Sequence, residues 1–327
     1  MVKQWQTAIE GVEVQCINSA SKHHGKYDLV IVDEAHRSLS PQFRNLYYNV
    51  EAEYWLLLTA TVPKNEEYQE LMFKIAPKLI EIDINTAKEH DAISDFVVYN
   101  LEVSLSGKHL GLYNVFNKKF ADANLALMKL RKTRGLTQMP FEIAKEYAKR
   151  QGTDPIIKWS KQYWGAMQMR KTVLYTNPTK LHVARDILKR FPNRKWILFF
   201  KSIDQAQDFA DEHGYLCYHS KMSTREREEA LTAFKVLKQA VIVSVDALIE
   251  GVDIPDVDSA ICLSGNSVPL SFIQSLGRTV RRTDDSKKSM FINLYAKGTN
   301  ERNWIDSKTE GIPTVEVKSY LQINDKP

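Results

Sequence analysis

The segment of the sequence best suited to chemistry is Asp33-Glu34-Ala35-His36, which directly follows the apolar run 28–32. An acidic pair at the carboxyl end of a strand lies at the edge where open parallel sheets bind their ligands. Asp33 could hold Mg²⁺ through its water shell, because Mg²⁺ prefers few carboxylates and keeps several waters. Glu34 could accept a proton from a water that attacks a phosphate. A solvated turn that caps a helix has the same composition, so the interpretation depends on the rest of the chain.

Three later segments share this polar character. They are Thr59-Ala60-Thr61, which ends a second apolar run, the stretch from Ser244 to Asp253, and the stretch from Gln274 to Arg282. Arg278 and Arg281 are three residues apart, so one helical turn would direct both guanidinium groups to the same place. Guanidinium groups that reach a γ-phosphate stabilise the charge of a phosphoryl-transfer transition state.

The four segments, in this order, strongly resemble motifs II, III, V and VI of the superfamily 2 helicases, of the DEAH-lettered kind. Residues 199–200 and 203–210 look like motif IV of the same family. The resemblance covers roughly residues 5–105 and 172–295. It implies an α/β fold with two RecA-like parallel-sheet lobes, the first one incomplete, and it implies ATP and Mg²⁺ as cofactors.

The resemblance also implies roles for individual residues. Glu34 and Asp33 correspond to the catalytic carboxylates, with Asp33 as the water-mediated Mg²⁺ contact, and Arg278 and Arg281 to arginine fingers. The remaining implied residues are Gln274, Gly251 and Asp253 at the nucleotide, His36, Thr59 and Thr61 as coupling residues, and Ser244 at the nucleic acid. For the coupling residues, a capped strand end with satisfied hydroxyl groups is the simpler alternative.

The elements that must position these residues are predicted from hydrophobic periodicity. Strands are predicted at 12–17, 28–32, 54–58, 196–200, 215–218, 240–245, 259–263 and 290–294, and helices at 66–75, 203–213, 224–237 and 270–276. Continuous rather than alternating apolar strands indicate burial on both faces, and therefore a parallel sheet covered by helices.

A basic segment separates the two α/β parts. Residues 108–195 hold 20 Lys or Arg and 5 acidic residues, a net charge of +15, whereas the whole chain has +5. The pattern predicts a basic helical insertion at 108–171, between a partial first lobe at 1–107 and a second lobe at 172–327. Its cations, in particular Lys118, Lys119, Arg131, Lys132 and Arg134, are expected to contact nucleic-acid phosphates, and the interleaved aromatic residues are expected to be available for base stacking. A solvated charged face is the alternative for such a run.

The phosphate-cradling motif G-x-x-x-x-G-K-[ST] of the family is absent from the sequence. Gly25-Lys26 is followed by Tyr27, and Gly107-Lys108 by His109, so neither pair supplies it. The stretch 3–5 resembles the part of the family just after motif Ia, so we expect the chain to begin inside the first lobe. Three alternatives stay open: a fragment, a second polypeptide that supplies the loop, and a pseudo-helicase that binds nucleic acid without ATP turnover.

The expected function is therefore an ATP-dependent helicase or translocase. DNA is favoured over RNA, because the long insertion and the Gln-x-x-Gly-Arg-x-x-Arg form resemble branch-migration, phage-type and repair helicases. With 43% hydrophobic and 26% charged residues the chain has ordinary globular composition, and three cysteines are too few for a disulfide framework. No signal peptide and no run of 18 apolar residues is present, so we expect a cytoplasmic protein without a membrane partner.

Overall fold

The computed structural model describes residues 11–59, 62–63, 65–82, 86, 96–245, 257–264 and 289–324. The chain divides into two compact units. The described residues up to 86 belong to the first unit and those from 96 onward to the second, and each unit is described by itself.

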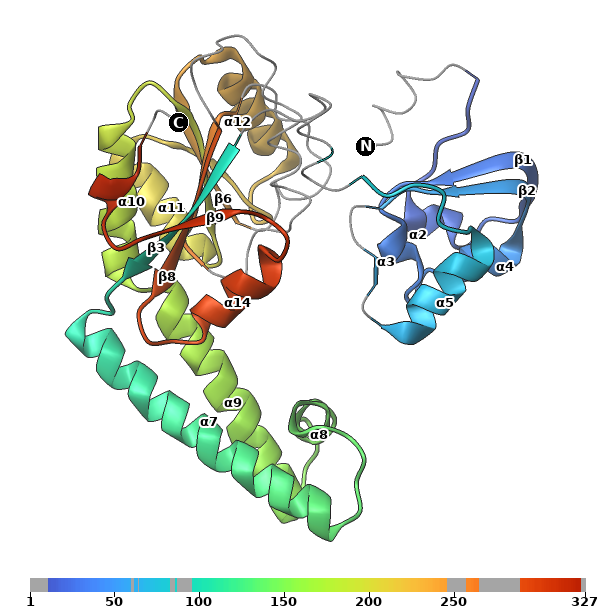
Figure 1. Cartoon of the computed structure of the whole chain (residues 1–327), viewed down its shortest axis with the longest axis horizontal. Coiled ribbons are helices and arrows are strands. Elements are labelled where there is room, and N and C mark those ends of the chain that lie inside the picture. The colour runs from blue at the N-terminus through green and yellow to red at the C-terminus, as the bar shows by residue number, and fades with distance from the viewer. Residues whose placement is uncertain are drawn as a thin grey trace. The chain divides into compact units, whose positions relative to one another are not determined.

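The first unit is built on two parallel strands, β1 (Gly25–Val32) and β2 (Val50–Leu57). Its helices are α2 (Ile17–Ala20), α3 (Ala35–Ser38), α4 (Leu46–Asn49) and α5 (Glu66–Ile75) (Figure 1). Val32, Ala35, Leu46 and Val50 form its small buried core. The helix predicted at 66–75 is confirmed, and the Asn65 side chain caps it by accepting from Tyr68 N.

Two predictions for this unit are wrong. Residues 12–16 have no regular structure, because Cys16 O accepts from Ser19 N and Ala20 N in a local turn that leads into α2. The strands β1 and β2 are also not buried on both faces. Leu29 and its register partner Tyr54 are 50% and 63% exposed, since no described element covers that face of the strand pair.

The second unit contains a parallel sheet of seven strands in the order β5-β6-β4-β7-β8-β3-β9. The strands are β3 (Phe96–Val103), β4 (Lys195–Phe200), β5 (Leu216–Tyr218), β6 (Ala240–Val245), β7 (Ser259–Cys262), β8 (Ser289–Ala296) and β9 (Thr314–Val317). Every residue of β4 and of β8 is buried. In this unit the predicted parallel sheet with two buried faces is confirmed.

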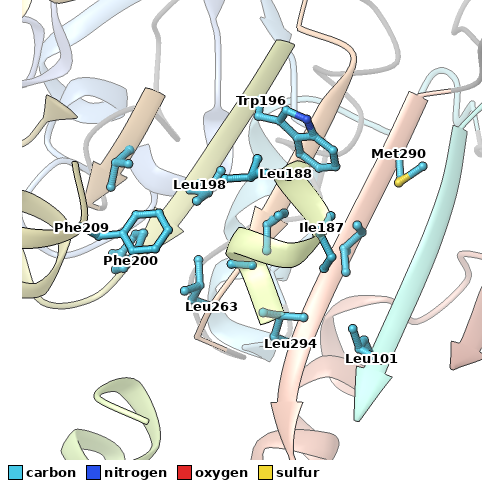
Figure 2. Packing of buried hydrophobic residues seen from close by; sticks show 14 of the residues in the cluster. Leu101, Ile187, Leu188, Trp196, Leu198, Phe200, Phe209, Leu263, Met290 and Leu294 are labelled. Carbon is cyan, nitrogen blue, oxygen red and sulfur yellow. The ribbon is translucent and has the colours of Figure 1, made fainter. Parts of the chain in front are cut away.

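Helices supply the apolar side chains that cover this sheet. They are α10 (Pro178–Arg190), α11 (Ile203–His213), α12 (Thr224–Val236) and α14 (Glu301–Lys308), followed by the 3₁₀ turn η1 (Tyr320–Gln322). Figure 2 shows Ile187 and Leu188 of α10 and Phe209 of α11 packed against Trp196 and Phe200 of β4. The predicted start of α12 is confirmed, since Ser223 Oγ accepts from Glu226 N. The helix predicted at 270–276 lies outside the described residues.

One assignment made from the sequence changes in the structure. Residues 96–107 are predicted to belong to the first lobe, yet β3 lies between β8 and β9 in the sheet of the second unit. Its eight residues pair with all eight residues of β8, from Phe96 with Ser289 to Val103 with Ala296. The partners are almost 200 residues apart in the chain, and a local pattern does not reveal such a pairing.

The basic segment is helical, as predicted, and forms a hairpin on the second unit. It consists of α7 (Gly107–Thr133), α8 (Pro140–Tyr147) and α9 (Pro155–Tyr175), and α7 and α9 run side by side (Figure 1). With 27 residues, α7 is about 40 Å long. No helix of the described residues, α7 included, is long and apolar enough to cross a membrane.

Candidate functional site

The carboxyl ends of β1 and β2 lie next to each other because the two strands are parallel and in register, with Val32 opposite Leu57. The pairing extends past the strands. Leu58 N donates to Val32 O, and Ala35 N donates to Leu58 O, both at 2.9 Å. These bonds hold the acidic segment 33–36 against the residues that follow β2.

Glu34 has an unusual backbone conformation at this edge. Its φ of 51° and ψ of 45° place it in the left-handed region, and no other non-glycine residue of the described ranges has a positive φ. Such a conformation costs about 1–2 kcal/mol for a residue with a β-carbon. It persists where surrounding contacts impose it, which is common at functional sites. Here the Ala35–Leu58 bond on one side and the Asp33 side chain, which accepts from Glu34 N at 2.9 Å, hold the turn.

Three of the predicted side chains meet at this turn. His36 Nδ1 lies 3.0 Å from Thr59 Oγ1 and 3.4 Å from Glu34 Oε2. The carboxylate and the imidazole are each about one-third exposed, at 37% and 33%, so solvent and ligands can reach them. The imidazole therefore bridges the carboxylate that follows β1 and the hydroxyl group that follows β2. Thr61 lies outside the described residues.

Asp33 suits a water-mediated Mg²⁺ contact. The residue is exposed, and Oδ1 is the oxygen that accepts from Glu34 N. Throughout the described ranges, no three His, Cys, Asp or Glu side chains gather as a direct metal site. A single exposed carboxylate is compatible with Mg²⁺ that keeps most of its water ligands.

Most of the residues implied for the second lobe belong to ranges that the structure does not describe. Gly251, Asp253, Gln274, Arg278 and Arg281 lie outside the described residues. Ser244 is described. It is fully buried in β6, and its Oγ has no hydrogen-bond partner in the described part of the chain. This position does not favour the direct nucleic-acid contact that the resemblance implies for Ser244.

The five predicted cations of the hairpin fall into two groups. Lys118, Lys119 and Lys132 are exposed. Arg134 makes a bidentate ion pair with Asp154, with N–O distances of 2.8 and 2.9 Å. Arg131 donates a hydrogen bond to Thr137 O at 3.1 Å. The Arg134 guanidinium, together with a hydrogen bond from Ile156 N, holds the pKa of Asp154 below its ordinary value. Both arginines thus have partners within the hairpin.

The aromatic residues of the segment do not form the predicted stacking surface. Tyr113 and Tyr163 are buried, and Phe116, Phe120, Trp159 and Trp164 are half-buried; Phe116 packs in the cluster of Tyr113, and Phe120 and Trp159 in the cluster of Tyr163. The rings of Phe120 and Tyr163 lie 4.6 Å apart, and the Arg170 guanidinium lies 4.1 Å from the Phe120 ring centre. The prediction that these rings are available for base stacking is wrong for the buried Tyr113 and Tyr163 and stays a prediction for the half-buried rings.

Lys129 is an exposed cation that the interpretation of the sequence did not single out. It follows Lys118 by eleven residues, which is close to three helical turns. Once the helix is known, this spacing places both lysines on one face, and the spacing alone could have identified Lys129.

Two family models match the chain. Residues 179–283 match the family described as helicase conserved C-terminal domain, and residues 7–64 match the family described as type III restriction enzyme, res subunit. The DNA 3'-5' translocase XPB2 of Sulfurisphaera tokodaii is 24% identical over 299 residues, which cover 90% of this chain and 65% of that protein. The ATP-dependent RNA helicase HAS1 of Lodderomyces elongisporus is 32% identical over 108 residues, which cover 32% of this chain and 19% of that protein.

Among solved structures, S. cerevisiae Dbp5 bound to RNA and ADP BeF3 has a TM-score of 0.52 at 14% identity, covering 89% of this chain and 59% of that one. The fold is thus an α/β fold whose parallel sheets resemble two RecA-like helicase lobes. In its sequence the chain is distantly similar to the XPB2 translocase and to DEAD-box helicases, and two of its segments are similar to helicase and restriction-enzyme families. It spans less than two-thirds of the length of the relatives named above.

Proposed function

We propose that the chain provides the motor part of an ATP-dependent nucleic-acid helicase or translocase. The observation that carries the proposal is the constellation of Glu34, His36 and Thr59 at the joined ends of β1 and β2. A carboxylate held in a strained turn, bridged by an imidazole to the neighbouring strand end, suits a general base whose state is linked to a second site.

The roles of the residues follow from this arrangement. Asp33 would hold Mg²⁺ through water, and Glu34 would accept the proton of the attacking water. When bound, Mg²⁺ would neutralise charge that develops on the phosphate oxygens. Arg278 and Arg281 would stabilise the transition state, with Gln274, Gly251 and Asp253 at the nucleotide; these assignments rest on the sequence motifs.

We favour DNA as the nucleic acid. The relative whose name describes a DNA translocase aligns with 90% of this chain, whereas the RNA helicase HAS1 aligns with 32% of it. The alignment with the DNA translocase is long enough to include residues of the hairpin. The hairpin itself lies between the two family matches, at 7–64 and 179–283. This supports a DNA-directed function at the level of analogy.

The alternative is a nucleic-acid-binding protein without ATP turnover. It follows from the sequence, in which no segment has the G-x-x-x-x-G-K-[ST] pattern. Because positioning and electrostatics account for most of phosphoryl-transfer catalysis, hydrolysis needs a cradle for the β- and γ-phosphates. In our proposal, polypeptide outside residues 1–327, in the same or in a second chain, supplies that loop.

The deciding experiment measures phosphate release with ATP, Mg²⁺ and forked DNA. Residues 1–327 alone are compared with the same residues joined to a segment that carries the phosphate loop, and Glu34→Gln is the control in both. We expect turnover that depends on DNA only in the joined protein, and none with Glu34→Gln. A joined, folded and DNA-binding protein without turnover would support the alternative. DNA-dependent turnover by residues 1–327 alone would contradict the proposed need for the loop.

A further inference from the structure

We infer that one exposed face of α7, defined by Lys118, Lys129 and Lys132 and named here the lysine face, binds the phosphate backbone of a nucleic-acid duplex. The inference rests on the proposed function, since it names the form of nucleic acid that the motor holds. Neither the family matches nor the names of the relatives assign a role to these three side chains.

The spacing of the three lysines aligns them along the helix. Lys129 and Lys132 follow Lys118 by eleven and fourteen residues, close to three and four turns, so all three side chains leave α7 in nearly the same direction. They extend over about 21 Å of the helix axis. The opposite side of α7 carries Ala123 and Leu127, which are fully buried in the hairpin core.

The charge of the lysine face is only partly neutralised from within: Asp122, an exposed residue four positions after Lys118, lies on the same side of α7, so these four side chains carry a net charge of +2. Residues 108–171 contain 14 basic and four acidic residues. Three of the four carboxylates are engaged elsewhere: Glu142 accepts from Met139 N, Glu146 from Arg150 and Asp154 from Arg134. In the described part of the chain, Lys118, Lys129 and Lys132 have no ion pair. A row of exposed cations of this kind attracts the phosphate backbone of a nucleic acid.

The form of the nucleic acid follows from what surrounds the lysines. Proteins that hold single strands combine cations with exposed aromatic rings on which bases stack. In this hairpin the rings of Phe120 and Tyr163 pack on each other inside the core. The lysine face, as defined by its three lysines, carries no aromatic ring, and it suits the phosphate backbone of a duplex, which presents one negative charge per about 1.7 Å of its axis. The contact would be independent of sequence.

The lysine face is also held in a fixed orientation relative to the seven-stranded sheet. At the base of the hairpin, Tyr113 of α7 and Leu174 of α9 are buried against Ala296 at the end of β8. Asn177 Nδ2 donates to Ser104 O at 3.1 Å, and this bond joins the segment just before α7 to the segment just after α9. A duplex bound to α7 would therefore move with the second unit.

The test compares two triple variants of residues 1–327 by fluorescence anisotropy, without ATP. One variant is Lys118→Gln/Lys129→Gln/Lys132→Gln. The matched control, Lys189→Gln/Lys235→Gln/Lys238→Gln, removes three exposed lysines elsewhere on the second unit. Each protein is titrated with a blunt duplex and with a single strand of equal length, between about 50 and 200 mM salt. Circular dichroism checks that helix content is unchanged.

We expect the lysine-face variant to bind the duplex at least tenfold more weakly at low salt. Its salt slope, the slope of the logarithm of the binding constant against the logarithm of the salt concentration, should be smaller in magnitude by about 0.9 for each lost phosphate contact. The control variant should retain the wild-type slope. An unchanged slope, an equal loss in the control variant, or a larger loss on the single strand would each overturn the inference. Because ATP is absent, failure of the proposed ATP turnover leaves this result unaffected, and an active motor with an unchanged duplex slope overturns the lysine face alone.

Discussion

His36 Nδ1 and Thr59 Oγ1, from residues 23 positions apart in the chain, lie 3.0 Å apart and join the segments that follow β1 and β2. The same imidazole ring nitrogen also lies 3.4 Å from Glu34 Oε2. A change at the end of β2 can therefore reach the carboxylate at the end of β1 through one side chain. Chains of contacting side chains of this kind are one physical route by which two sites can be coupled.

Thr59→Val should weaken that path. The substitution keeps the shape of the side chain and removes the hydroxyl group, which costs about 0.5–1.5 kcal/mol for one hydrogen bond. In a protein with the phosphate loop present, we expect nucleic-acid stimulation of ATP hydrolysis to fall by about two- to tenfold, with KM for ATP little changed. Thr59→Ser retains the hydroxyl and should retain the stimulation. Wild-type stimulation in Thr59→Val would show that the contact is only structural.

The left-handed conformation of Glu34 predicts opposite effects on stability and activity. Glu34→Gly removes the β-carbon that makes φ 51° unfavourable, so we expect the free energy of unfolding to stay the same or to rise by up to about 1 kcal/mol. Glu34→Gln keeps the β-carbon and should give no such gain. Urea unfolding measures the difference, and both variants should abolish turnover. A clear loss of stability in Glu34→Gly would mean that side-chain contacts of Glu34 outweigh the backbone strain.

Lys180 and Glu301 form a buried ion pair that ties α10 to α14. Lys180 is 1% exposed, and its Nζ donates to both Glu301 oxygens, at 2.6 and 2.8 Å, and to Leu263 O at 2.8 Å. Lys180→Met leaves a carboxylate buried without its cation, so we expect the second unit to lose about 3–5 kcal/mol of unfolding free energy. Lys180→Met/Glu301→Gln should lose less, because an amide oxygen can still accept from Ala296 N.

Chemical denaturation of these variants distinguishes the buried pair from ordinary surface pairs. Arg225→Gln breaks the ion pair between Arg225 and Glu229, whose side chains are 88% and 61% exposed, respectively. Because this pair is exposed, the substitution should change the free energy of unfolding little. If Lys180→Met were as mild as Arg225→Gln, the buried pair would contribute little. If the double variant were as unstable as the single one, the lost contact with Leu263 O would explain the effect instead of the uncompensated charge.

The sequence predicted the parts of this structure that depend on neighbouring residues. The helix 66–75 was predictable from its helical spacing, and the start of α12 was predictable because Ser223 caps the helix that follows it. Five of the seven strands in the sheet of the second unit were predictable from continuous apolar runs such as 196–200, since strands buried on both faces need no polar side chains. The proximity of the acidic segment 33–36 to Thr59 followed from the rule that parallel strands end at one edge.

The parts that depend on long-range pairing could not be predicted. No local pattern assigns β3 to β8 rather than to the first unit, because the choice depends on packing between residues such as Leu101 and Leu294. The aromatic residues of the basic segment show a related limit. The same helical spacing fits an exposed ring and a core ring, and only the packing of α7 on α9 shows that Tyr163 is buried.

Asp154 and Arg134 predict how the hairpin responds to acid. The Asp154 side chain pairs with Arg134 and caps α9 by accepting from Ile156 N at 2.9 Å, and these contacts, the first more than the second, lower its pKa from an ordinary value of 3.8. The folded hairpin therefore binds this proton less readily than the unfolded chain. Its contribution to stability is complete well above pH 3.8 and is lost as the pH falls through the lowered pKa.

Far-UV circular dichroism of wild type and Asp154→Asn, followed from neutral pH into this acidic range, measures that contribution. We expect Asp154→Asn to be less stable than wild type at neutral pH and to show a smaller loss on acidification, because asparagine still caps the helix but carries no charge. Identical acid profiles would show that other carboxylates control the transition.

Arg134→Gln should resemble Asp154→Asn in stability and should leave the duplex salt slope near wild type, since the Arg134 guanidinium is engaged by Asp154. A slope reduced as much as in the lysine-face variant would instead place Arg134 at the nucleic acid.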